Sequence, residues 1–127
     1  MTTDPHRELI DRYLAAYNAF DVAGMLATVH PDVTFRNVSA GEVTASADGR
    51  EALRALAEYA ATLFRSRRQT VRDYGADGDR AWITVDYEGE LAADVGPGLR
   101  AGDVLRLTGR STFAFRDGLI VELVDES

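Results

Sequence analysis

Residues 12–37 constrain the fold most strongly, because a helical repeat is followed there by a strand repeat. Tyr13 and Tyr17 stand four residues apart, which places both side chains on one face of a helix. After a turn, the chain alternates between apolar and polar residues, so Phe35 and Asn37 share one strand face. If the helix packs on this strand face, the tyrosines and the asparagine meet inside an apolar cavity.

The rest of the chain predicts an α+β domain, in which a strongly bent antiparallel sheet wraps around a long helix and an N-terminal helix pair. The inner face of the sheet would line a pocket open at one end. The expected helices span 5–19, a short segment capped by Asp21 and ended by Pro31, and 49–65, with Asp48 as a cap and Arg65, Arg67 and Arg68 at the end. The expected strands span 33–38, 69–76, 80–91, 105–116 and 119–125; 39–47 forms a loop or weak edge strand, and 92–103 a loop or mobile lid.

Composition narrows the functional classes. The 127 residues fit one domain, 1–127, and the net charge of −7 argues against nucleic acid or an anionic membrane as a partner. The sequence has no cysteine, and all 14 basic residues are arginine, so thiol and lysine Schiff-base chemistry are excluded. The N-terminus lacks an apolar signal core, and we expect a cytoplasmic protein.

Four polar residues fall on the predicted inward faces: Tyr13, Asn37, Ser111 and Asp125. A buried polar group without a partner costs about 1–3 kcal/mol, so a cluster of such groups indicates a site. The pattern gives the site an apolar wall for a small molecule, formed by Tyr17, Phe35, Leu56, Ala60, Phe64, Val85, Tyr87, Phe113, Val121 and Leu123. With only one inward carboxylate, no metal site is expected. No cofactor is expected either.

The N-terminal pattern resembles the nuclear transport factor 2-like superfamily, which includes ketosteroid isomerases, SnoaL-like polyketide cyclases and limonene epoxide hydrolases. The matching residues are Tyr13, the segment Asn18-Ala19-Phe20-Asp21 and the turn His30-Pro31-Asp32-Val33. The resemblance covers nearly the whole chain and implies a cone-shaped barrel. It is specific for the fold and less so for function, because this fold hosts several activities.

The resemblance also implies roles for the inward polar residues. Tyr13 occupies the position of the isomerases' oxyanion tyrosine, whereas Asn37 and Ser111 replace their aspartate base and second oxyanion donor. The epoxide hydrolases share the asparagine, but their arginine position corresponds to Val85 here. An aspartate on the last strand, as in the cyclases and hydrolases, makes Asp125 the candidate base, since burial would raise its pKa.

The leading hypothesis is therefore a SnoaL-like isomerase or cyclase that abstracts a proton next to a carbonyl. One alternative is a non-catalytic protein that binds an apolar ligand or acts as a dimeric interaction domain. A further alternative is an epoxide-type hydrolase in which Asn37 and Asp125 share a water molecule. Trp82, Ile120 and Val124 are expected to face outward, which favours a homodimer formed through the outer face of the sheet.

Overall fold

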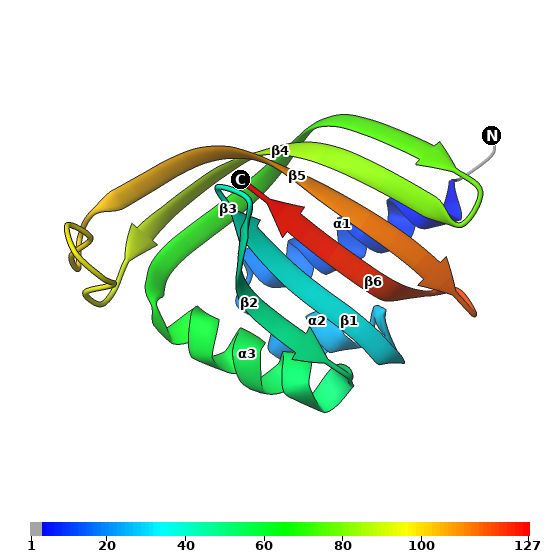
Figure 1. Ribbon diagram of the computed structural model, residues 1–127, viewed down its shortest axis with the longest axis horizontal. Helices are drawn as coiled ribbons and strands as arrows, with labels where there is room; N and C mark the ends of the chain where they lie inside the picture. Colours follow the sequence, from blue (N-terminus) through cyan, green and yellow to red (C-terminus); the bar gives the residue numbers. More distant parts are fainter. Residues whose placement is uncertain (1–3) are drawn as a thin grey trace.

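The computed structural model describes residues 4–127 (Figure 1). The helices are α1 (Pro5–Asn18), α2 (Val22–Leu26) and α3 (Arg50–Thr62). The strands are β1 (Val29–Ser39), β2 (Glu42–Asp48), β3 (Phe64–Asp77), β4 (Arg80–Leu91), β5 (Val104–Arg116) and β6 (Leu119–Glu126). The expected α+β class is confirmed, and the architecture is consistent with the cone-like fold.

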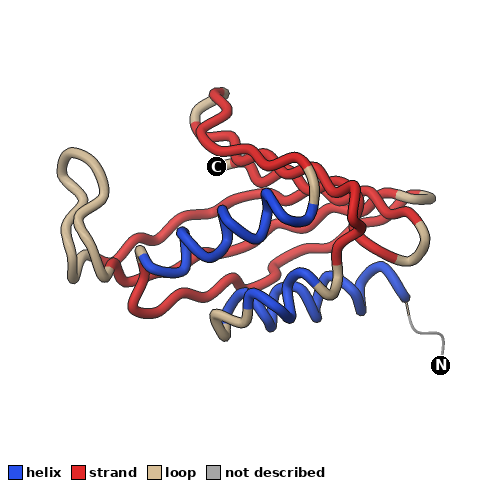
Figure 2. Tube along the Cα trace, turned by 90° about the horizontal axis from the view of Figure 1, so that it is seen from below, coloured by secondary structure: helices blue, strands red, loops and turns tan. Residues whose placement is uncertain are grey.

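A six-stranded sheet in the order β2-β1-β6-β5-β4-β3 forms the frame of the molecule. The long strands β3, β4 and β5 arch over the helices (Figure 1), and α3 lies next to the α1–α2 pair (Figure 2). The sheet is mixed rather than antiparallel throughout, because β1 runs parallel to β6. It is also not closed, since β2 and β3 remain as edges. The parallel pair brings the first and last strands together at the centre of the sheet.

Helix α1 begins as its sequence predicts. The side chain of Asp4 accepts hydrogen bonds from the backbone N–H groups of His6 and Arg7, and Pro5 occupies the first turn. The buried face of the helix consists of Leu9, Ile10, Tyr13, Leu14 and Ala16. This face packs against the concave side of the sheet and fixes the direction in which Tyr13 points.

The junction after α1 depends on Asn18. Its Oδ1 accepts a hydrogen bond from the backbone N–H of Gln69 at 2.8 Å, and its Nδ2 donates to the Gln69 carbonyl at 3.2 Å. Asp21 then caps α2 by accepting from the N–H of Gly24 at 2.9 Å. Two polar residues of the N-terminal motif are thus explained by backbone anchoring, which ties α1 to β3 on one wall of the cavity.

We expect Asn18→Ala to lower the free energy of unfolding by about 1–3 kcal/mol, because it leaves the backbone N–H and carbonyl groups of Gln69 without their side-chain partner. Urea denaturation would measure the change. Asn18→Asp is the matched variant, since it keeps the acceptor and loses only the donor, and it should cost less. A loss below about 0.5 kcal/mol for Asn18→Ala, as at an ordinary surface position, would contradict this anchoring role.

Several predicted boundaries were wrong near α3. The helix starts at Arg50 with Gly49 as its N-cap at φ 93°, and no side chain caps it, so the predicted Asp48 cap does not form. Asp48 instead pairs with Arg36 at 3.0 Å. The helix ends at Thr62, and the chain turns directly into β3, which pairs with β4 along its whole length. Strand pairing overrode the helical spacing at this point.

The cluster of arginines at the predicted end of α3 therefore lies on a strand. Arg67 points inward and is 5% exposed, whereas Arg65 and Arg68 are exposed. Alternation along β3, rather than a helix macrodipole, determines which guanidinium group is buried. This change brings a positive charge to the wall of the cavity.

The start of the sheet also differs from the prediction. α2 ends at Leu26, and Thr28 closes it by donating from Oγ1 to the Met25 carbonyl at 2.6 Å. Pro31 is therefore not the terminator, because it lies within β1, which begins at Val29. The segment expected to be a loop or weak edge strand contains the edge strand β2.

A bulge in β6 changes which of its residues face inward. Phe115 pairs with Ile120 and Ala114 with Glu122, so Val121 has no partner on β5 and the alternation shifts by one. Ile120 is consequently fully buried in the core rather than on the outer face. The prediction that Ile120 faces outward was wrong for this reason.

Trp82 and Val124 do share one register row on the convex face, with Thr112 between them. The Trp82 ring covers Gly75, where an added Cβ would lie 2.4 Å from the ring. Both side chains are half-buried, and the homodimer remains a prediction.

We expect Val124→Arg to fold normally and to weaken association, which sedimentation velocity would detect. A wild-type protein that sediments only as a 13.9 kDa monomer would refute the dimer.

Candidate functional site

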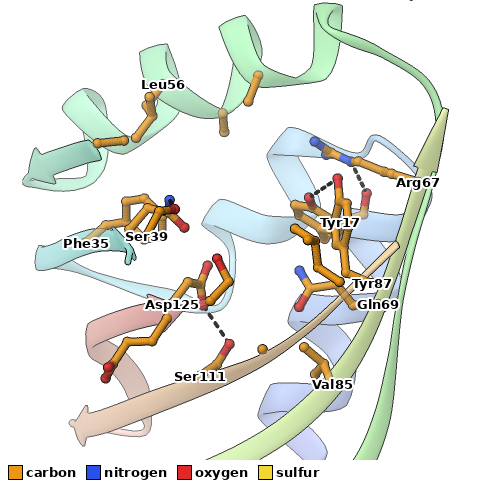
Figure 3. A pocket seen from close by; sticks show the side chains of 18 of the residues that line it. Tyr17, Phe35, Ser39, Leu56, Arg67, Gln69, Val85, Tyr87, Ser111 and Asp125 are labelled. Carbon is orange, nitrogen blue, oxygen red and sulfur yellow. Dashed lines mark hydrogen bonds between the residues drawn. The ribbon is translucent and has the colours of Figure 1, made fainter. Parts of the chain in front are cut away.

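A cavity of about 370 Å³ lies between the concave face of the sheet and the helices (Figure 3). Its volume falls within the range of small-molecule sites. Leu56 from α3 covers one side, and Tyr17, Tyr87 and Arg67 form the opposite wall (Figure 3). Asp125 and Ser111 lie below Leu56 in this view, across the cavity from Arg67. The lining is predominantly apolar, with a few polar groups directed inward.

The polar centre of the cavity is a row of three residues on neighbouring strands. Asn37 on β1 is in register with Asp125 on β6, and Asp125 is in register with Ser111 on β5. The Ser111 hydroxyl donates to Oδ1 of Asp125 at 2.6 Å (Figure 3). The register of the sheet therefore brings together three of the four polar residues identified in the sequence.

The environment of Asp125 favours its protonated form. Desolvation by burial raises the pKa of this carboxyl group to about 6, although the hydrogen bond from Ser111 acts in the opposite direction. A carboxylate with such a pKa is ionised at neutral pH and can still accept a proton from a weak acid. Asp125 thus has the electrostatic properties of a general base.

Tyr13 completes the group of four polar residues. Its side chain lines the cavity and is 5% exposed, and no side chain in residues 4–127 forms a hydrogen bond with its hydroxyl group. Burial and the negative charge of Asp125 raise the pKa of Tyr13 well above its ordinary value. The phenol therefore stays protonated and is a hydrogen-bond donor available to a ligand.

A second pair of phenols lies beside it. The Tyr17 hydroxyl donates to the Tyr87 hydroxyl at 3.3 Å, and the two rings meet edge to face with centroids 6.4 Å apart. Burial raises the pKa of both groups, so both remain neutral. Because Tyr17 uses its proton on Tyr87, the hydroxyl group of Tyr87 retains a free donor.

Asn37 lines the cavity, but its amide nitrogen is already engaged. Nδ2 donates to Oγ1 of Thr44 at 2.8 Å and lies 3.5 Å from Oγ of Ser39. The register neighbour Asp125 lies one strand away. With its donor committed to β2, Asn37 offers mainly its carbonyl oxygen to a ligand.

The structure places most predicted wall residues in the cavity and excludes three. Tyr17, Phe35, Leu56, Ala60, Phe64, Val85 and Tyr87 line it. Phe113 and Leu123 are 1% exposed and belong to the hydrophobic core, away from the cavity lining. Val121 is removed from the lining by the β6 bulge. The missed residues include Arg67 and Gln69, which alternation along a longer β3 could have identified.

Arg67 is the most unusual of the missed residues. Its guanidinium carbon lies 3.7 Å from the centroid of the Tyr17 ring and 4.6 Å from that of Phe20. Its Nε donates to the Tyr17 carbonyl at 3.0 Å. Stacking on two aromatic rings stabilises a buried cation without requiring a carboxylate partner. The cavity wall therefore carries a positive charge.

Residues 4–127 contain neither a cluster of metal ligands nor a helix that could span a membrane. This part of the chain has no group of three or more histidine, aspartate or glutamate residues placed to hold a metal ion. None of the helices within it has the length and apolar character needed to cross a membrane.

Comparisons with known proteins agree with this geometry. The family model of the SnoaL-like domain matches residues 10–123, so the chain belongs to the SnoaL-like family. The solved structures that share this fold include candidate polyketide cyclases and a protein with a ketosteroid isomerase-like fold. A search of curated proteins gave no match.

Solved structures show the same fold over nearly the whole chain. A candidate polyketide cyclase from Xanthomonas campestris pv. campestris is 23% identical, with a TM-score of 0.82 and coverage of 97% of this chain and 90% of that one. A candidate polyketide cyclase from Silicibacter sp. TM1040 is 25% identical, with a TM-score of 0.76 and coverage of 98% and 90%. A protein with a ketosteroid isomerase-like fold from Catenulispora acidiphila, in complex with trimethylamine, is 18% identical, with a TM-score of 0.77 and coverage of 93% and 83%.

Proposed function

We propose that this protein is an isomerase or cyclase that abstracts a proton from the carbon next to a carbonyl group of an apolar small molecule. The observation that carries the proposal is the Asp125 carboxylate, which lies in an apolar cavity, accepts a hydrogen bond from Ser111 and has a pKa of about 6. Membership of the SnoaL-like family and the similarity to candidate polyketide cyclases support the same reaction class.

In the proposed reaction, the free oxygen of Asp125 takes the proton, and the electron pair of the C–H bond moves toward the carbonyl oxygen to form an enolate. Ser111 keeps the other carboxylate oxygen in place at 2.6 Å. The neutral phenol of Tyr13 donates a hydrogen bond to the developing negative charge on the substrate oxygen. Base and donor thus act on opposite ends of the same enolate system.

Two outcomes can follow from this enolate. Asp125 can return the proton to a different carbon, which completes an isomerisation. Alternatively, the enolate carbon attacks a second carbonyl carbon of the same substrate and closes a ring, and the new alkoxide takes the proton. The first step is common to both reactions, so an experiment on proton abstraction tests them together.

The test measures deuterium exchange into 2-tetralone, an apolar bicyclic ketone with acidic protons next to its carbonyl. Proton NMR in D₂O would follow the loss of these signals with and without the protein. We expect exchange above the buffer rate in the wild type and a return to the buffer rate in Asp125→Asn. Exchange at the buffer rate in the wild type as well, with 2-tetralone binding preserved, would instead support the non-catalytic binder.

A further inference from the structure

The cavity contains a positive charge to which the proposed proton abstraction assigns no role. Arg67 is 5% exposed and lines the cavity. It lies near the start of β3, where it pairs with Gly89 on β4. Among the residues that the structure describes, no carboxylate lies within ion-pair distance of its guanidinium group. The other arginines that form ion pairs do so at the surface, where water screens them.

The hydrogen-bonding capacity of Arg67 is also only partly used. Nε is occupied by the Tyr17 carbonyl at 3.0 Å, whereas Nη2 is buried with no hydrogen-bond partner within residues 4–127. Tyr17 and Phe20 cover the faces of the guanidinium plane, so its unused donors lie along the edge. A buried charged donor without a partner is costly, and a ligand oxygen would relieve that cost.

The two charged groups of the cavity lie at separate places. Asp125 is held on the sheet by Ser111, and Arg67 lies on the opposite wall beside Tyr17 (Figure 3). The two groups can therefore contact different ends of one ligand.

We propose that Arg67 is the site that selects an acidic substrate: the ligand carries a carboxylate or another anionic oxygen group, which the Arg67 guanidinium binds while its apolar body fills the cavity. The assignment as substrate rests on the proposed function of Asp125. A planar guanidinium binds a carboxylate through two parallel hydrogen bonds, which a neutral ketone or ester cannot form with equal strength. Tyr87, with its free hydroxyl donor, lies on the same wall and can contact the same oxygen group.

The test compares two ligands of similar shape, 2-naphthoate and 2-acetylnaphthalene, by isothermal titration at pH 7.5. We expect the wild type to bind the acid at least about tenfold more tightly than the ketone, the usual effect of a charge-assisted hydrogen bond. In Arg67→Met, which keeps an apolar stem, this preference should disappear. Arg67→Lys should retain part of it, because the charge remains but the fork is lost.

Arg68→Met is the matched control, because Arg68 is the exposed neighbour on the same strand and does not line the cavity. Its preference for the acid should equal that of the wild type. A wild type with no preference for 2-naphthoate would overturn the proposal, and this result does not depend on how any variant folds. A preference that persists in folded Arg67→Met, or disappears equally in Arg68→Met, would overturn it as well.

The experiment also separates this inference from the proposed function. Asp125→Asn should leave the preference for 2-naphthoate in place, because Asp125 lies on a different wall. If 2-tetralone exchanges deuterium but the acid is not preferred, the role of Arg67 is refuted and proton abstraction stands. If the acid is preferred but 2-tetralone binds without exchanging deuterium, Arg67 is supported as a ligand-binding residue and the proton abstraction by Asp125 is refuted.

Discussion

Asp125→Asn is expected to lower the rate of deuterium exchange into 2-tetralone by about 10²–10⁴-fold, the usual contribution of a positioned general base. An amide has nearly the same shape as the carboxylate and can still contact Ser111, but it cannot accept a proton at neutral pH. Ligand affinity should change little, because the apolar lining and Tyr13 are untouched. NMR exchange rates together with titration of the ligand would separate these two effects.

The pH dependence of the wild type provides an independent check. Since burial raises the pKa of Asp125 to about 6, exchange catalysed by the protein should increase as the pH rises through 6 and level off above about 7. The raised pKa of Tyr13 keeps its phenol protonated throughout this range. Subtracting the buffer rate at each pH isolates the contribution of the protein.

Asp125→Asn should lower the exchange rate but increase the stability of the folded protein at neutral pH. The folded-state pKa of Asp125 lies above its ordinary value of 3.8, so the folded protein binds more protons than the unfolded chain between about pH 4 and 6. Stability contributed by this group is therefore lost as the pH rises through that window. Asp125→Asn removes the loss, and we expect it to stabilise the fold by about 1–3 kcal/mol at pH 7.5 relative to its effect at pH 4.

Glu126→Gln is the control, because it removes a neighbouring carboxylate that also lines the cavity but is exposed. Its exchange rate should stay within about twofold of the wild type, because Glu126 lies outside the row of Asn37, Asp125 and Ser111 that holds the proposed base. Exchange by Asp125→Asn at the wild-type rate would remove Asp125 from the mechanism. So would a pH profile that is unchanged between pH 5 and 7.

Ile120→Arg is expected to unfold the protein, because Ile120 is fully buried and packs in the core. A guanidinium group at this position has no partner and no route to water, and changes of this kind cost more than about 4 kcal/mol. Most domains of this size have only about 5–15 kcal/mol of stability in total. Far-UV circular dichroism and a thermal scan would show the loss of the cooperative transition.

Two variants control this experiment. Ile120→Val keeps the site apolar and should cost only about 0.5–1.5 kcal/mol. Val124→Arg introduces the same charge on the convex face of β6 and should remain folded. If Ile120→Arg folds and merely loses self-association, the bulge in β6 is misplaced and Ile120 faces outward after all.

The sequence by itself determined the local elements and their class. The predicted helix over 5–19 is only one residue longer than α1. Its start was predictable because Asp4 and Pro5 form it through contacts that lie within one turn. Asp117 and Gly118 form the turn between β5 and β6, and both residues adopt the positive φ that such a hairpin turn requires. Alternation placed Ser111 and Asp125 on the inner face, and the register brings them together. These features depend on neighbours in the chain, which a sequence displays directly.

Only the tertiary structure decided which strands pair and where alternation is interrupted. The bulge at Val121 exchanged the faces of Ile120 and its neighbours, and the parallel pairing of β1 with β6 set Asn37 beside Asp125. The extension of β3 along β4 converted the predicted helix end into a strand and buried Arg67. Hydrogen bonds between distant strands outweigh local propensity, because they satisfy backbone groups that would otherwise be buried without partners.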